Sequence, residues 1–101
     1  MAERLDLHDK LKKLLGSENV YYQPPESKKI NYPAILYSRD DIESKFANDR
    51  SYKLSNKYLI TVIDRMPDNP VIEKILNLPM SSFDRHYVSD NLNHDVLILY
   101  F

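Results

Sequence analysis

The chain has 101 residues, the size of one domain, and we expect residues 1–101 to form a single unit around one core of modest stability. Its 14 basic and 15 acidic residues give a formal net charge of -1, and the basic residues are scattered along the chain rather than gathered into a stripe. This balance argues against direct nucleic-acid binding as the main role. The chain has no cysteine, which excludes disulfides, thiolate metal ligands and a cysteine nucleophile.

The use of glycine and tyrosine points away from catalysis and toward protein contact. Gly16 is the only glycine, whereas catalytic loops that wrap a phosphate or form an oxyanion hole usually need glycine for close backbone approach. There are eight tyrosines, and tyrosine offers the large, stiff, amphipathic area that is enriched where protein surfaces meet. We therefore expect a protein that is not an enzyme.

The N-terminal segment gives no sign of a leader or a membrane anchor. Residues 1–15 carry charges throughout, with no apolar centre typical of a signal peptide. No apolar run in the chain approaches the ~20 residues that a membrane span needs. The sequence therefore predicts a soluble protein of the cytosol.

The first predicted element is an amphipathic helix over residues 3–15. Leu7 and Leu11 follow helical spacing, acidic residues come early and lysines come late. Gly16 stands where a helix commonly has the residue just past its end.

Two strands are predicted before a long polar stretch. Residues 19–22 form a short strand candidate, and Pro33 fixes the entry to a second strand over residues 34–38. Residues 38–55 are polar with isolated apolar positions. They are typical of a long exposed hairpin with its tip near residues 48–49 or of a mobile loop, and we favour the hairpin.

The clearest strand covers residues 58–64. These residues are apolar on both faces, which is typical of a central strand. After the strand, Asn69 is placed to cap a short helix, with Pro70 at the first helical position and Pro79 beyond the end.

The last segment predicts a hairpin of strands 82–88 and 95–101, joined through the polar residues 89–94, with Phe101 inside the packed sheet. The order α-β-β-β-α-β-β indicates an α+β fold with a small, mixed, mainly antiparallel sheet and two helices. Strands 58–64 and 95–101 are apolar on both faces, and two short helices cannot cover both faces of such a sheet. We therefore expect another copy of the chain or a partner protein to cover the rest.

One short stretch is crowded with side chains that could carry chemistry. Asp84, His86, Asp90, His94 and Asp95 fall within 12 residues, where carboxylates and imidazoles could converge on a metal ion. The spacing lacks the tight ligand pairs of zinc sites, so a hydrogen-bonded turn with a polar intersubunit patch is the favoured interpretation. The enzyme alternative is a metal-dependent hydrolase that uses Asp84, His86 and His94.

Seven of the eight tyrosines divide into two groups. Three are expected to pack on the sheet: Tyr58, Tyr87 and Tyr100. Four others lie on segments expected to be short or exposed, where nucleic-acid stacking is the functional alternative: Tyr21, Tyr22, Tyr37 and Tyr52. Because arginine and lysine do not alternate with these four, protein contact is favoured.

We expect two segments to contact neighbouring molecules. In residues 38–55, Phe46 and Tyr52 are apolar anchors in an otherwise solvated stretch. The segment 85–95 offers charge-assisted hydrogen bonds, and four of its residues are the expected participants: Arg85, Asp90, Asn91 and His94.

Several segments together resemble the tail terminator proteins of long-tailed bacteriophages, which are also called tail completion, head-tail joining or minor capsid proteins. They are YPAILY (32–37), FANDRSY (46–52), YLITVIDRMPDNP (58–70) and SFDRHYVSDNLNHDVLILYF (82–101). The resemblance spans most of the chain, and the pairing of VIDRMPD with DRHYVSDNLNHD is more specific than either half.

The resemblance implies a structural virion protein that assembles into a ring, generally hexameric, at the head-proximal end of the tail tube. Such a ring stops tube polymerisation and presents a docking face to the head. The implied partners are other copies of the chain, the tail tube protein and a head completion or connector protein, while DNA only passes through the lumen. The resemblance implies no cofactor, no metal and no catalytic residue, and it places the protein in the virion after synthesis in the bacterial cytoplasm. A head completion or connector protein of the neck is the alternative.

Overall fold

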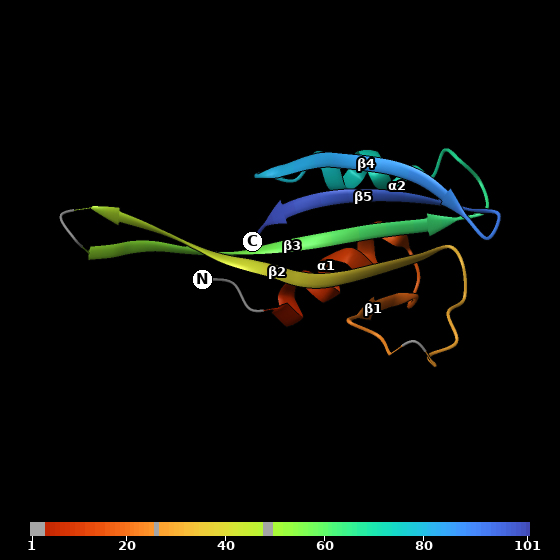
Figure 1. Cartoon of the computed structure of the whole chain (residues 1–101), viewed down its shortest axis with the longest axis horizontal. Coiled ribbons are helices and arrows are strands. Elements are labelled where there is room, and N and C mark those ends of the chain that lie inside the picture. Colours follow the sequence, from red (N-terminus) through yellow and green to blue (C-terminus); the bar gives the residue numbers. More distant parts are fainter. Residues whose placement is uncertain (1–3, 26, 48–49) are drawn as a thin grey trace.

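The computed structural model describes residues 4–25, 27–47 and 50–101, and for residues 40–55 it describes the backbone alone. Two helices pack against a single sheet of five strands (Figure 1). In chain order the elements are α1 (Arg4–Leu15), β1 (Val20–Tyr22), β2 (Ala34–Ala47), β3 (Arg50–Asp64), α2 (Val71–Leu76), β4 (Ser81–Ser89) and β5 (Leu92–Tyr100).

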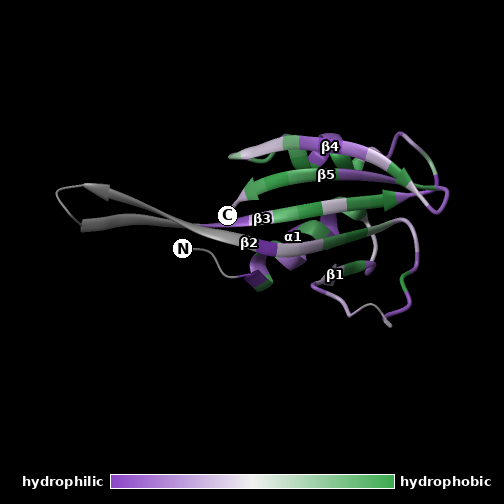
Figure 2. Cartoon of the chain, in the orientation of Figure 1, coloured by the Kyte–Doolittle hydropathy of each residue, from purple (hydrophilic) through white to green (hydrophobic). Residues whose placement is uncertain are grey.

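The sheet is mixed and mainly antiparallel. Its strand order is β1-β2-β3-β5-β4, with β1 parallel to β2 and the other neighbours antiparallel. The predicted α+β fold and its α-β-β-β-α-β-β order are thereby confirmed. β3 is the middle strand, as the apolar residues on both of its faces predicted. Figure 2 shows hydrophobic residues along much of β3 and β5, which are neighbours in the sheet.

Both helices lie on one face of the sheet, behind it in the view of Figure 1. Leu7 and Leu11 of α1 and Ile75 of α2 are completely buried. They pack into a single core with the strand residues that point to the same side: Ile35, Tyr37, Tyr58, Ile60, Val62, Leu97 and Leu99. Phe101 also packs against this core, and its N–H donates to the carbonyl of Asn56 at 2.9 Å, so the C-terminal residue is held to the sheet.

The helix ends follow the local signals in the sequence. Gly16 has φ +75 and its N–H donates to the carbonyl of Lys12 at 2.8 Å, which closes the end of α1 in the left-handed conformation that glycine tolerates best. At the start of α2, Asn69 Oδ1 accepts a hydrogen bond from the N–H of Val71 at 2.9 Å. Pro70, directly before the helix, already has helical dihedral angles.

The polar stretch over residues 38–55 forms the predicted hairpin. β2 and β3 pair with each other out to Ala47 and Arg50, past the point where β5 ends its pairing at Lys57. The part beyond the body, residues 40–47 and 50–55, is called the arm below. It extends the molecule to 50 × 25 × 23 Å (Figure 1). The predicted tip at residues 48–49 lies outside the described residues.

The last hairpin differs from its prediction in the length of its turn. Residues 89–94 were expected to join the strands, but β4 continues to Ser89 and β5 begins at Leu92. Only Asp90 and Asn91 make the turn, with φ 54 and φ 62. Positive φ at both central residues gives the tight turn whose twist matches that of an antiparallel hairpin, and Asp and Asn tolerate it better than other non-glycine residues.

Candidate assembly surface

One face of the sheet carries no helix in the described part of the chain, because α1 and α2 both lie on the other face (Figure 1). Side chains alternate between the two faces along a strand, and directly opposite residues on neighbouring strands share a face. The registers therefore define this open face as rows that cross β2, β3, β5 and β4 in turn. The rows are Ala34–Ile63–His94–Tyr87, Leu36–Thr61–Val96–Arg85 and Ser38–Leu59–Ile98–Ser82.

The three rows are almost free of charged side chains, although the same face continues toward the arm with Lys57 opposite Tyr100. Arg85 is the only Asp, Glu, Lys or Arg residue in the rows. The outer side of α1 is different, since Asp6, Asp9, Lys10 and Lys13 are all exposed there. Surfaces that meet other proteins are depleted of Lys, Glu and Asp and enriched in aromatic residues and Arg. The composition of the open face therefore suits contact with a protein better than contact with bulk water.

Side chains of the open face partly cover one another. Ala34, Ile63 and Val96 are only 0%, 5% and 2% exposed although no described helix lies over them. Leu36, Leu59 and Ile98 are half-buried. The face thus combines buried apolar side chains with three aliphatic side chains, in two adjacent rows, that are still open to contact.

Tyr87 and His94 form a stacked pair at the β4 side of the open face. Their ring centroids are 4.6 Å apart and the planes differ by 10°. His94 Nδ1 lies 3.1 Å from the carbonyl oxygen of Leu92, and because a carbonyl can only accept, Nδ1 carries the proton. The stack and the hydrogen bond fix the orientation of the imidazole.

The expected contact residues fall into two groups at opposite ends of the molecule (Figure 1). Arg85 and His94 share the open face, and the exposed Asp90 and Asn91 form the turn of the same hairpin. Phe46 and Tyr52 belong to the arm, where the register steps across Tyr52, and their side chains lie outside the described part of the structure. The structure therefore brings the first group together and places the second apart from it.

The residues of the hydrolase alternative do not meet. His86 is opposite Asp95 and His94 is opposite Tyr87, so the two histidines point to different faces of the sheet. Asp84 is exposed at the register shift between Phe83 and Arg85. Within the described residues no group of three or more Asp, Glu, His or Cys is arranged to hold a metal ion.

His86 has a partner that its sequence position did not reveal. Its Nδ1 lies 2.8 Å from Oδ1 of Asp95, a buried carboxylate on the helix side of β5. A two-residue turn at Asp90 and Asn91 pairs position 86 with position 95. The sequence prediction assumed a six-residue connection, which gives a different register. The pair ties the edge strand β4 to its neighbour.

One expectation about the tyrosines is wrong. Tyr37 was assigned to a short or exposed segment, but it is buried, because β1 pairs beside it and α1 covers it. Its hydroxyl accepts a hydrogen bond from Arg4 at 3.2 Å and lies 2.7 Å from His8 Nδ1. Tyr22 packs against it with ring centroids 4.9 Å apart. These tyrosines belong to the core rather than to a stacking surface.

Burial shifts the acid–base behaviour of this cluster. Burial, followed by the positive charges of Lys12 and Arg4, lowers the pKa of His8 below 6.5. Burial raises the pKa of Tyr37, and the same cause raises the pKa of Tyr58. A neutral His8 can accept the hydroxyl proton of Tyr37, so the shifts agree with the short contact between them.

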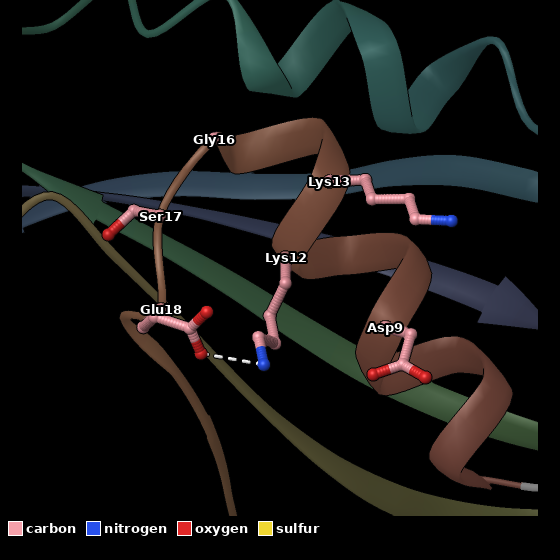
Figure 3. A pocket seen from close by; sticks show the side chains of 6 residues that line it. All are labelled: Asp9, Lys12, Lys13, Gly16, Ser17 and Glu18. Atoms are coloured by element: carbon pink, nitrogen blue, oxygen red, sulfur yellow. Dashed lines mark ion pairs between the residues drawn. The ribbon is translucent and has the colours of Figure 1, made fainter.

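A cavity of about 460 Å³ lies beside the end of α1 (Figure 3). Lys12 and Glu18 form an ion pair of 2.6 Å at its wall, and the hydrogen bond to Glu18 raises the pKa of Lys12. Each of these two charged side chains thus has the other as its partner. No group of three or more Asp, Glu, His or Cys in the described residues is arranged to hold a metal ion, and this includes the wall of the cavity.

Comparisons with known proteins give no assignment: no protein-family model matches the chain, and no curated protein sequence matches it. In the described residues, no helix is long and apolar enough to cross a membrane. The resemblance to tail terminator proteins therefore enters below as a proposal.

Proposed function

We propose that this chain is a structural virion protein of a long-tailed bacteriophage, a tail terminator that assembles into a ring at the head-proximal end of the tail tube. The ring stops tube polymerisation and joins the tail to the head. Its partners are copies of itself, six in the ring of the family it resembles, together with the tail tube protein and a head completion or connector protein. The chain acts by contact and not as an enzyme.

The observation that carries the proposal is the open face of the sheet. Its rows contain one charged residue and present Leu36, Leu59 and Ile98 half-buried. A monomeric protein rarely leaves a contiguous apolar layer uncovered, and the composition is that of a protein contact. The arm adds a second feature of assembling subunits, because it reaches past the body and offers the backbone edges of two strands.

The charge of the chain fits a ring through which DNA slides. A net charge of -1 and basic residues scattered along the sequence do not favour the neutralisation of several phosphates together. A lumen of this kind lets packaged DNA pass without holding it.

Deletion of the gene for this chain from its phage tests the proposal. We expect DNA-filled heads, separate tails and tail tubes longer than normal, with the intact chain restoring joined particles when supplied in trans. Separate tails of normal length would favour the head completion alternative, because termination would then be intact. Normal infectious particles would refute both roles.

A further inference from the structure

A small apolar groove opens on the helix side of the sheet, at the end from which the arm projects. Its volume is about 200 Å³, below the ~300–1,000 Å³ typical of small-molecule pockets, so it suits one large side chain rather than a whole ligand. Met80 at its wall is 56% exposed. The described lining residues that matter here are Leu78, Met80, Leu99, Phe101 and Lys10, and among their side chains only that of Lys10 is charged.

The arm includes a large apolar residue, Phe46, but the extended hairpin places this residue far from the groove of the same copy. Asn56 and Phe101 exchange backbone hydrogen bonds, and Phe46 is opposite Ser51, five residues further along β3. At about 3.3 Å per residue, the backbone of Phe46 lies roughly 17 Å beyond the level of Phe101. The arm of one copy therefore cannot fill the groove of the same copy while the hairpin stays extended.

The chemistry of the arm favours Phe46 as the occupant of a second copy's groove. Phe46 has no polar atom, whereas the hydroxyl of Tyr52 would need a hydrogen-bond partner that an apolar groove does not supply. The arm is acidic on its β2 strand, where residues 40–47 hold three carboxylates and one lysine, and basic on its β3 strand, which holds Arg50 and Lys53. Lys10 at the groove has the complementary charge.

We propose that Phe46 of one copy fills the groove beside Met80 and Phe101 of a second copy, with Lys10 facing the acidic side of the arm. This inference rests on the proposed function, since each member of a ring must both give and receive the same contact. An arm seated in a groove uses two different surfaces, and such heterologous contacts form a ring when their rotation closes.

Disulfide trapping tests the contact, because the chain has no cysteine of its own. The full-length Ala47→Cys and Met80→Cys variants, both of which keep Phe46 and one of which is isotopically labelled, are mixed under oxidising conditions. The experiment is run on purified protein at assembling concentration and on phage particles. A disulfide needs Cα atoms within about 7 Å, so we expect mixed dimers to exceed by at least about tenfold those formed with Leu5→Cys. Leu5 is the matched control, being 59% exposed on α1 and outside the groove.

A second comparison separates contact from folding. Phe46→Ala should lower the assembled fraction by at least about tenfold, the effect of removing a buried aromatic anchor, while Tyr52→Ala should leave most of it. Circular dichroism melting verifies that both variants fold. Equal trapping at Met80 and Leu5, or no mixed dimer in either preparation, would overturn the inference. Particles that contain the chain yet give no dimer linked through positions 47 and 80 would overturn it and leave the proposed function standing, whereas normal particles after gene deletion overturn the function itself.

Discussion

At the scale of single residues, the protonation of His8 makes the stability of the fold depend on pH. Its Nδ1 lies 2.7 Å from the Tyr37 hydroxyl, and burial with the charges of Lys12 and Arg4 holds its pKa below 6.5. The unfolded chain therefore takes up the proton first as the pH falls. The contribution of neutral His8 to the free energy of unfolding is therefore fully present above about pH 6.5. It declines as the pH falls toward and through the lowered pKa of folded His8.

Replacing His8 by Gln should weaken this dependence. Between pH 7.5 and 5.5 the free energy of unfolding of the unaltered chain should fall more than that of His8→Gln, by at most about 1.4 kcal/mol per pH unit for one proton. Urea unfolding at both pH values measures the difference. Equal losses in the two proteins would contradict the assigned role.

The matched control is Tyr37→Phe. It removes the hydroxyl that Arg4 and His8 contact, and it should cost about 1 kcal/mol at both pH values. Because burial and nearby cations cause the pKa shift of His8, the pH dependence itself should persist in this variant.

The residue scale also shows where sequence reasoning stops. Gly16 and Asn69 were predictable because a helix end depends on residues within a few positions. The contact of His8 with Tyr37 joins residues 29 positions apart, and nothing local indicates it. Tyr37 was therefore placed on an exposed segment although β1 and α1 bury it.

At the scale of elements, the end of α1 depends on the backbone freedom of Gly16. An added Cβ would meet no atom within 4 Å, so crowding is not at issue. The φ of +75 alone should make Gly16→Ala less stable by about 1 kcal/mol, with a smaller loss for Gly16→Asn, since Asn tolerates this conformation. Chemical denaturation measures both variants, and an unchanged midpoint for the Ala variant would show that the helix can end otherwise.

The turn between β4 and β5 offers a test that separates folding from contact. Asn91→Gly keeps a positive φ at no steric cost, so the monomer should be as stable or up to about 1 kcal/mol more stable. If Asn91 contributes a contact as proposed, the same variant should assemble less well. Asn91→Val should destabilise the monomer itself, because a β-branched residue resists positive φ. Thermal melting of the monomer and sedimentation of the assembly distinguish the two effects.

The presence of a helix or strand could be predicted from the sequence better than the residue at which it begins or ends. The two-sided apolar strand and the helix after Asn69 were evident from their patterns, and both are present. The turn at Asp90 and Asn91 was missed because it contains no glycine, the usual sign of positive φ, so Asn93 and His94 were assigned to a loop instead of β5.

At the scale of the whole molecule, the sequence predicted that two helices leave part of the sheet uncovered. The structure shows both helices on one face and, in the described residues, none on the other. The sequence could not predict which side chains share that face. This depends on the registers of four strands and on the register shift in β4. Arg85 lies on the open face only because the shift follows Phe83.

Arg85 provides the sharpest test of the open face as a contact surface. It is exposed, so Arg85→Glu should change the free energy of unfolding of the monomer by no more than about 0.5 kcal/mol. The same change reverses the one charge in the three rows of a proposed interface, where a mismatched charge costs several kcal/mol, so assembly should fall sharply. Arg65→Glu is the matched control, with the same charge change at an exposed position after β3 and outside the rows. Sedimentation velocity across a concentration series should show assembly lost in the Arg85 variant and retained in the Arg65 variant. Equal behaviour of the two would assign the effect to net charge and remove the open face from the interface.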